Sequence, residues 1–278
     1  MKIILVPIDF STGSINALDY AIQIANVLVC NLRIVHVMTG KNYPIQIADH
    51  FGKIGEPALQ ECMNILIEEK KTAYTVPNGV FDYKLRTGNV VKEITNQAKY
   101  DDATIIVVGT HGVSGFEDNW IGSNSYRLVS HSSCPVLTIR NEFKYNGIKR
   151  IIIPIDITQG SRLKVPAATG MAKVFHSDVF VVGLRESNYE FVFNRVRTAA
   201  KQVQKYVEDQ LDIEVQLDML SGSGITEKLI EYSRENKADL IIENLIHSSN
   251  PLDNLVNFSA NHIVNNSVTP VLFIPTNE

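Results

Sequence analysis

Short apolar runs rich in β-branched residues alternate along this chain with longer segments in which apolar residues recur at helical spacing. Residues 2–8 form the first such run and predict a buried strand. Within residues 12–29, Leu18, Ile22 and Ala25 recur at i, i+4 and i+7, which predicts a helix that packs one apolar face on a sheet. The same alternation continues through the rest of the sequence.

The alternation predicts the following elements. In the first half, strands are expected at residues 2–8, 32–38, 81–87, 103–109 and 135–140, and helices at 12–29, 56–73, 89–99 and 122–132. In the second half, strands are expected at residues 149–155, 178–184, 213–219, 239–244 and 270–275, and helices at 160–175, 188–211, 224–236 and 257–266. Strands and helices that alternate with short connections are typical of parallel strands joined by right-handed crossovers. We therefore expect an α/β fold in which each half is a five-stranded parallel-sheet sandwich.

The two halves repeat each other. The segment ILVPIDFS at 4–11 matches IIIPIDIT at 151–158, and residues 109–140 align on residues 244–275 without a gap. A duplicated domain explains both matches, and KYNGIK at 144–149 is the expected junction.

The repeat predicts two domains, residues 1–144 and residues 148–278. In open parallel sheets, ligands bind beyond the carboxyl ends of the strands, where the strand order reverses. Functional residues are therefore expected directly after the predicted strands.

Composition narrows the class of protein. Hydrophobic residues make up 45% of the chain and charged residues 20%, and the net charge is −4 without a long basic run, which argues against nucleic acid as a partner. No apolar run reaches the roughly 18 residues of a membrane helix, and MKIILVPIDF is interpreted as a buried strand rather than a signal peptide. The three cysteines, Cys30, Cys62 and Cys134, show no disulfide or zinc spacing. We expect a cytoplasmic protein with no membrane partner.

Two polar features fall at the expected carboxyl edge of the first half. Asp9 ends the first strand, and GTHGVSGFEDNWIGSNS at 109–125 follows the fourth. Gly109 and Gly112 permit close backbone approach, and a helix that begins near Gly122 offers unpaired N–H groups to an anion. One helix end contributes only about 0.3–1 kcal/mol, whereas micromolar affinity needs roughly 8 kcal/mol. The loop, its hydroxyl groups and an adenine pocket would have to act together.

The glycine-rich segment resembles a known signature. It reads glycine, two residues, glycine, nine residues, glycine and serine, which is similar to the ATP-binding signature of the universal stress protein family. The flanking VPIDFS, HV at 36–37 and HSSCPVL at 131–137 also resemble that family, and the resemblance covers both halves. It implies a tandem family member with an adenine nucleotide alpha-hydrolase-like, Rossmann-like fold. It also implies that the fifth strands of the two repeats pair around a pseudo-twofold axis.

The resemblance further implies which residues contact the nucleotide. Asp9 and the preceding backbone would lie beside ribose and adenine, and the backbone of Val37 would read the adenine edge. The loop and the start of the following helix would hold the phosphates of ATP, with or without Mg²⁺. The complete expected set of cofactor-binding residues is Pro7, Ile8, Asp9, Val37, Gly109, Gly112, Gly122, Ser123, Asn124 and Ser125.

The second half has lost this motif. In the gapless alignment Asn244 stands opposite Gly109 and Phe258 opposite Ser123, whereas Asp156 stands opposite Asp9. We predict that the second half does not bind ATP through this motif, and that it serves as a packing partner or binds a different ligand.

Three functions remain open at this point. The leading hypothesis is an ATP-binding regulatory protein of the stress response, with an adenine nucleotide and an unidentified protein as its partners. The second is a slow ATPase, for which Asp9 and Arg127 are the only candidate groups and for which no catalytic residue is assigned. The third is an interaction scaffold that binds no nucleotide, with the glycine pattern retained as a tight loop for folding alone. Homodimerisation is compatible with all three.

Overall fold

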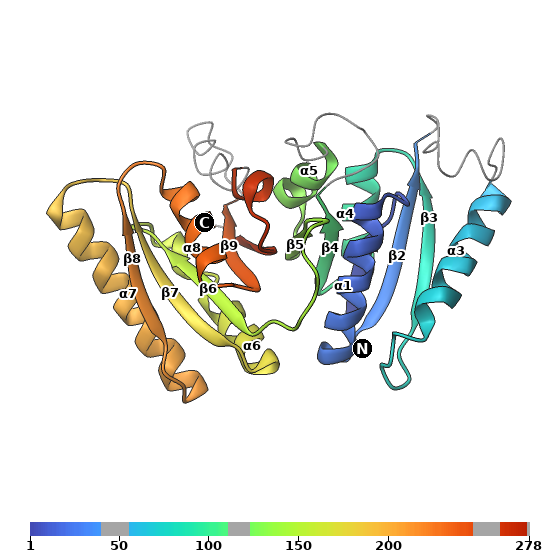
Figure 1. Ribbon diagram of the computed structural model, residues 1–278. Helices are drawn as coiled ribbons and strands as arrows, with labels where there is room; N and C mark the ends of the chain where they lie inside the picture. Colours follow the sequence, from blue (N-terminus) through green and yellow to red (C-terminus); the bar gives the residue numbers. More distant parts are fainter. Residues whose placement is uncertain (40–55, 111–122, 247–261, 277–278) are drawn as a thin grey trace. The chain divides into compact units, whose positions relative to one another are not determined.

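The chain consists of two compact units, which we call unit 1 and unit 2 and describe from a computed structural model (Figure 1). Unit 1 is Met1–Lys144 and unit 2 is Tyr145–Glu278. The residues that the structure describes are 1–39, 56–110, 123–246 and 262–276.

Unit 1 is an α/β sandwich around a five-stranded parallel sheet. Its strands are β1 (Ile3–Pro7), β2 (Asn31–Met38), β3 (Phe81–Thr87), β4 (Ile105–Gly109) and β5 (Val136–Ile139). Its helices are α1 (Thr12–Leu28), α3 (Glu56–Lys71), α4 (Val90–Tyr100) and α5 (Ser123–His131). The strand order is β3-β2-β1-β4-β5, and the recorded pairings within it are parallel. The direction in which successive strands are added therefore reverses between β1 and β4.

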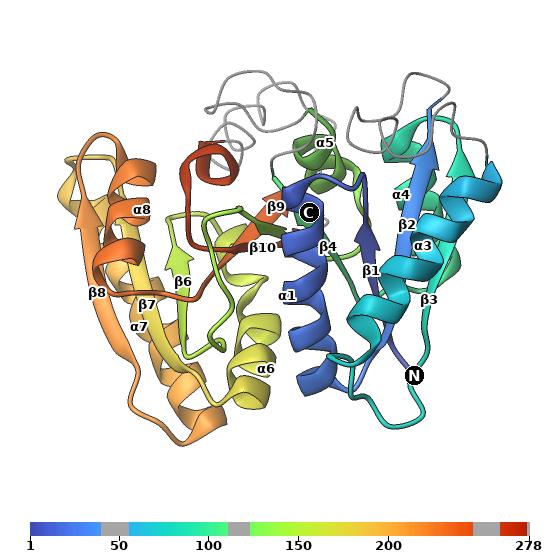
Figure 2. The same cartoon turned by 45° about the vertical axis from the view of Figure 1, so that its right-hand side comes forward.

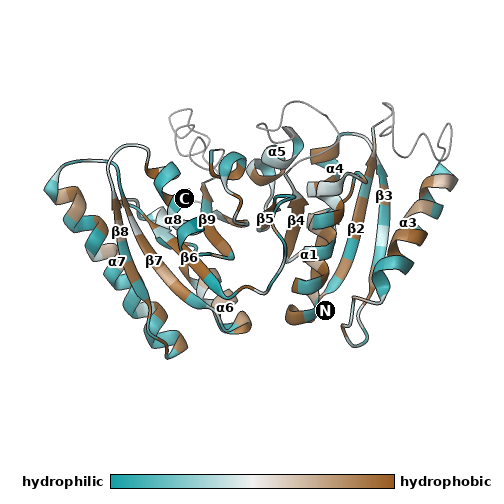
Figure 3. Ribbon diagram, viewed as in Figure 1, coloured by the Kyte–Doolittle hydropathy of each residue, from teal (hydrophilic) through white to brown (hydrophobic). Residues whose placement is uncertain are grey.

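The sequence explains how the layers of unit 1 form. In Figure 2, α1 and α3 lie in front of the sheet and α4 and α5 lie behind it, as right-handed crossovers on either side of the reversal require. The side chain of Ser11 caps α1 by accepting a hydrogen bond from the backbone N–H of Ser14, and Val29 ends this helix in the left-handed conformation. Figure 3 shows β2 and β4 as largely hydrophobic, which agrees with their burial under helices on both faces.

Unit 2 repeats this architecture. Its strands are β6 (Arg150–Ile155), β7 (Asp178–Arg185), β8 (Gln216–Ser221), β9 (Leu240–Ile246) and β10 (Val271–Thr276). Its helices are η1 (Gly160–Arg162), α6 (Val165–Phe175), α7 (Glu190–Leu211) and α8 (Ile225–Glu235), and residues 262–266 are also helical. The strand order is β10-β9-β6-β7-β8, so the reversal here lies between β6 and β9.

The predicted helix 160–175 is interrupted in the structure. A 3-10 turn, η1, ends at Arg162, and α6 begins only at Val165. Pro166 occupies the first turn of α6, where its missing N–H costs nothing, whereas one continuous helix would place it in the interior. The other predicted elements agree with the structure to within a few residues at their ends, except that most of the predicted helix 257–266 lies outside the described residues.

Equivalent hydrogen bonds recur in the two units and fix their correspondence. The N–H of Asn31 donates to the carbonyl of Lys2 at 2.8 Å, and 147 residues later Asp178 donates to Lys149 at 2.8 Å. The N–H groups of Cys30 and Ser177 likewise donate to residues 25 and 172. The repeat found in the sequence therefore extends to the backbone, and positions in the two units can be compared one by one.

Among the residues that the structure describes, no helix combines the length and the apolar character needed to cross a membrane.

Candidate functional site

The ends of β1 and β4 meet at the reversal of strand order in unit 1. Ile4 of β1 pairs with Ile105 of β4, so the two strands run side by side toward the same edge of the sheet. Asp9 follows the end of β1 and Gly109 ends β4. The two features that the sequence singled out therefore lie at neighbouring strand ends, where open α/β sheets bind ligands.

A tight turn holds the carboxylate of Asp9. Its Oδ1 accepts the N–H of Ser11 at 3.0 Å and the hydroxyl of Ser11 at 2.5 Å. Between them, Phe10 adopts a left-handed conformation with φ of 63°. The turn positions a half-buried carboxylate at the strand end, beside the first turn of α1.

The backbone after β1 is tied to β2. The N–H of Ile8 donates to the carbonyl of Val35 at 2.9 Å, and Nδ1 of His36 lies 2.7 Å from the carbonyl oxygen of Ile8. Burial lowers the pKa of His36, which favours the neutral ring with its proton on Nδ1 and donating to Ile8. Pro7 pairs with Val35, so Val37 lies two positions farther along β2, level with Asp9.

Gly109 is needed for packing within unit 1. A Cβ at this position would lie 2.5 Å from the carbonyl oxygen of Gly13 and 3.0 Å from the backbone nitrogen of Ser14. Gly109 is not among the residues with positive φ. The close backbone approach expected from the sequence is thus made to the first turn of α1.

The start of α5 completes the site. The hydroxyl of Ser125 is buried and donates to the carbonyl of Gly109 at 2.8 Å, which links α5 to the end of β4. Ser123 is the first residue of α5, and Asn124 is exposed. The structure therefore brings Asp9, Gly109 and Ser125 to one edge. The predicted phosphate-binding residues Gly112 and Gly122 lie outside the described residues.

The sequence analysis missed three small residues that shape this edge. The hydroxyl of Ser11 donates a hydrogen bond to the carboxylate of Asp9. The absence of a side chain on Gly109 lets its backbone pack against that of Gly13. The hydroxyl of Ser14 accepts a hydrogen bond from the N–H of Asp9 at 3.3 Å. Their signal was the stretch FSTGS directly after Asp9, in which a capping serine and a glycine open the helix. Arg127, the basic group considered for ATP hydrolysis, is exposed on α5.

The corresponding edge of unit 2 keeps the carboxylate and changes the rest. Oδ1 of Asp156 accepts the N–H and hydroxyl of Thr158 at 2.7 Å and 2.6 Å. Asn244, the counterpart of Gly109, donates its side-chain amide to the carbonyl of Gly160, the counterpart of Gly13. Phe258 lies outside the described residues. The position that Gly109 leaves without a side chain in unit 1 therefore carries the side chain of Asn244 in unit 2.

Metal ligands are not grouped in the parts of the chain described here: no cluster of three or more His, Cys, Asp or Glu side chains there could hold a metal ion. The three cysteines are free thiols, and burial raises the pKa of each.

Comparison with known proteins gives a consistent result. The sequence profile of the universal stress protein family matches residues 1–140. A universal stress protein from Bacillus subtilis is 34% identical over 148 residues, which are 49% of this chain and 97% of that protein. One from Methanocaldococcus jannaschii is 27% identical over 150 residues, 51% of this chain and 84% of that protein. The crystal structure of a universal stress protein from Archaeoglobus fulgidus covers 98% of both chains at 19% identity with a TM-score of 0.74, which shows a shared fold.

Proposed function

The chain belongs to the universal stress protein family, and from this premise we propose that it binds ATP at the carboxyl edge of unit 1 and acts as a nucleotide-responsive regulator in the stress response. In this proposal the nucleotide is a ligand rather than a substrate. The protein works in the cytoplasm, where the ATP pool lies, and a protein partner distinguishes its loaded form from its empty form.

One observation supports this proposal most directly. Asp9, the end of β4 and the start of α5 converge on the strand reversal, and the hydrogen bond from Ser125 to Gly109 joins the last two. A carboxylate at such an edge can accept hydrogen bonds from ribose hydroxyls, and the first N–H groups of a helix attract phosphate. The glycine and serine pattern from Gly109 to Ser123 resembles the ATP-binding signature of the family.

The proposed contacts follow from this arrangement. Asp9 binds the ribose, while the backbone of Pro7, Ile8 and Val37 borders the adenine. The phosphates lie between the glycine-rich loop and the start of α5, where they meet the backbone at Gly109, Gly112, Gly122 and Asn124 and the hydroxyl groups of Ser123 and Ser125. The hydroxyl of Ser125 would rotate from the carbonyl of Gly109 toward a phosphate oxygen when the nucleotide binds.

Calorimetric titration of the full chain with Mg-ATP tests the proposal, and the repeat supplies a matched control. Asp9 and Asp156 accept the same pair of hydrogen bonds from the residue two positions later, so Asp9→Asn and Asp156→Asn perturb the two units equally. We expect Asp9→Asn to weaken ATP binding by at least about tenfold, which is the 1.4 kcal/mol of a lost hydrogen bond to a charged group. Asp156→Asn should leave the affinity unchanged.

Thermal unfolding gives a second readout. A ligand that binds only the folded state at a hundred times its dissociation constant stabilises that state by about 2.7 kcal/mol. Mg-ATP should raise the melting temperature of the full chain, and Gly122→Asp, which adds a negative charge and a side chain at the proposed phosphate site, should remove the rise. If millimolar nucleotide raises the melting temperature of neither the wild-type protein nor the Asp156→Asn variant, the proposal is wrong.

A further inference from the structure

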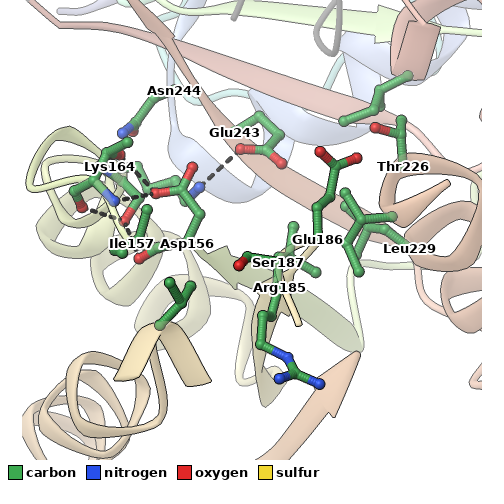
Figure 4. A pocket seen from close by; sticks show the side chains of 16 residues that line it. Asp156, Ile157, Lys164, Arg185, Glu186, Ser187, Thr226, Leu229, Glu243 and Asn244 are labelled. Atoms are coloured by element: carbon green, nitrogen blue, oxygen red, sulfur yellow. Dashed lines mark hydrogen bonds and ion pairs between the residues drawn. The ribbon is translucent and has the colours of Figure 1, made fainter. Parts of the chain in front are cut away.

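Unit 2 contains a cavity of its own at the carboxyl ends of β6, β7 and β9. Its volume is about 410 Å³, which lies within the range of small-molecule sites. Charged residues contribute to its wall, and between them lies a largely apolar lining (Figure 4). Its wall includes Asp156, Lys164, Leu184, Glu186, Leu229 and Glu243.

A buried ion pair forms part of the wall. Nζ of Lys164, directly before α6, lies 2.8 Å from Oε2 of Glu243 on β9. The side chain of Lys164 is 2% exposed and that of Glu243 is 16% exposed. Burial raises the pKa of Glu243, and the ammonium group of Lys164 opposes that rise. The ion pair with Lys164 is thus the main interaction that favours the charged form of Glu243 at the cavity wall.

The first repeat shows that this fold does not need such a pair. Counting by the correspondence of the two units, the counterpart of Lys164 is Ala17 and the counterpart of Glu243 is Val108, and both counterparts are buried and apolar. A buried ion pair is often no more stabilising than apolar residues of similar size, because the desolvation of both charges offsets their attraction. Stability therefore does not explain the appearance of a lysine and a glutamate at these two positions.

The cavity carries an excess of negative charge. Among the described residues that line it, three carry a carboxyl group, Asp156, Glu186 and Glu243, and one carries an ammonium group, Lys164. Figure 4 shows the carboxylates of Glu243 and Glu186 facing the same space, while the side chain of Arg185 points away. The guanidinium group of Arg185 lies 5.0 Å from the centre of the Phe193 ring. This charge balance disfavours a phosphate and favours a cation.

We propose that the cavity of unit 2 binds a small organic amine, whose ammonium group pairs with Glu243 and Glu186 and whose apolar body packs against Leu184 and Leu229. The bound ammonium group neutralises the excess negative charge, and its attraction is stronger toward Glu243, which is less exposed than Glu186. This site is distinct from the nucleotide site proposed in unit 1, and neither proposal depends on the other.

Calorimetric titration of the full chain with benzylamine, which is protonated at neutral pH, tests this proposal. Benzyl alcohol and benzoate carry the same ring with a neutral and an anionic group. We expect benzylamine to bind at least tenfold more tightly than either, and Asp9→Asn to leave this binding unchanged. Equal binding of the amine and the alcohol would overturn the proposal, as would preferential binding of benzoate.

Variants assign the binding to the cavity. Glu186→Gln should weaken benzylamine binding about tenfold, and the double variant Lys164→Met with Glu243→Leu should weaken it further while it preserves the side-chain volumes. Glu235→Gln, which removes an exposed carboxylate at the end of α8, is the control and should have no effect. Melting curves establish that each variant is folded. Unchanged amine binding in the folded double variant would contradict the proposal.

Discussion

The backbone of Gly109 lies directly against that of Gly13, so closely that a Cβ on residue 109 would stand 2.5 Å from the carbonyl oxygen of Gly13. In unit 2 the corresponding carbonyl, that of Gly160, accepts the side-chain amide of Asn244 instead. The same corner of the repeated fold is thus closed by direct backbone packing in one unit and by a side-chain hydrogen bond in the other.

The first prediction concerns the packing of Gly109. Gly109→Ala should lower the free energy of unfolding of the ligand-free chain by about 1–3 kcal/mol, because the added methyl group must push β4 away from the start of α1. Urea denaturation followed by circular dichroism measures the change.

The control for this substitution is Gly170→Ala. Gly170 lies within α6, and apart from its chain neighbours and the backbone of its own helix no atom lies within 4 Å of the position that its Cβ would take. Alanine is the better helix former there by roughly 1 kcal/mol, so Gly170→Ala should stabilise the protein. If both substitutions change the free energy of unfolding equally, the close contact between Gly109 and Gly13 is not the cause of the effect of Gly109→Ala.

The fold could be predicted from the sequence because its signals are local and repeated. The strand at 81–87 agrees with β3 residue for residue, since its alternating pattern ends at turn residues on both sides. The break before α6 is also present in the sequence as Pro166, but the apolar periodicity of 160–175 concealed it. Helical spacing alone cannot distinguish one helix from a 3-10 turn followed by a helix.

The sites were less predictable, because they depend on contacts between distant residues. The glycine pattern after β4 predicted a close backbone approach, but only the structure shows that Gly109 makes this approach to the first turn of α1. Lys164 and Glu243 are 79 residues apart, and each by itself is one polar residue beside an apolar segment. Their pairing becomes visible only when β9 is placed beside the start of α6. The sequence alone does show that two apolar residues of the first repeat, Ala17 and Val108, are replaced by charged residues in the second.

The second prediction concerns the stability of the ion pair. Lys164→Met should cost about 3–5 kcal/mol at neutral pH, since it leaves the carboxylate of Glu243 buried without its partner. The double variant Lys164→Met with Glu243→Leu should be as stable as the wild-type protein or more stable. Guanidinium denaturation of both variants checks this.

The pH dependence of the single variant distinguishes charge from packing. The pKa of Glu243 is already raised by burial, and loss of Lys164 removes the interaction that opposes the rise. The folded form of Lys164→Met therefore takes up a proton at a higher pH than the unfolded chain does, so the variant should regain stability as the pH falls through the folded pKa. If the variant is less stable than the wild-type protein by the same free energy at acidic and at neutral pH, the loss of stability comes from packing alone.

The third prediction concerns the link between α5 and β4. Ser125→Ala removes the hydroxyl that donates to the carbonyl of Gly109 and should cost about 0.5–1.5 kcal/mol in the absence of nucleotide. Ser130→Ala is the matched control, because Ser130 donates within α5 to Tyr126, and this change should stay within about 0.5 kcal/mol. Chemical denaturation compares the two variants. Equal effects would mean that the contact with Gly109 contributes nothing specific.

The fourth prediction concerns His36, which supports the backbone beside Asp9. Burial holds the folded-state pKa of His36 below its ordinary value of 6.5, so the unfolded chain binds a proton more readily than the folded chain does. The contribution of the neutral ring is therefore complete above pH 6.5 and is lost as the pH falls below it toward the folded pKa. The slope for one such proton is at most about 1.4 kcal/mol per pH unit.

His36→Asn isolates this contribution, because the asparagine amide can still donate to the carbonyl of Ile8 but does not titrate. Unfolding free energies measured from pH 8 to pH 5 should fall more steeply for the wild-type protein than for the variant, and the two curves should run parallel above pH 7. A steeper fall in the variant would mean that the folded protein accommodates a charged His36. The hydrogen bond to Ile8 would survive in that case, because a charged imidazole ring also donates from Nδ1. Burial of the neutral ring would then not be the source of the pH dependence.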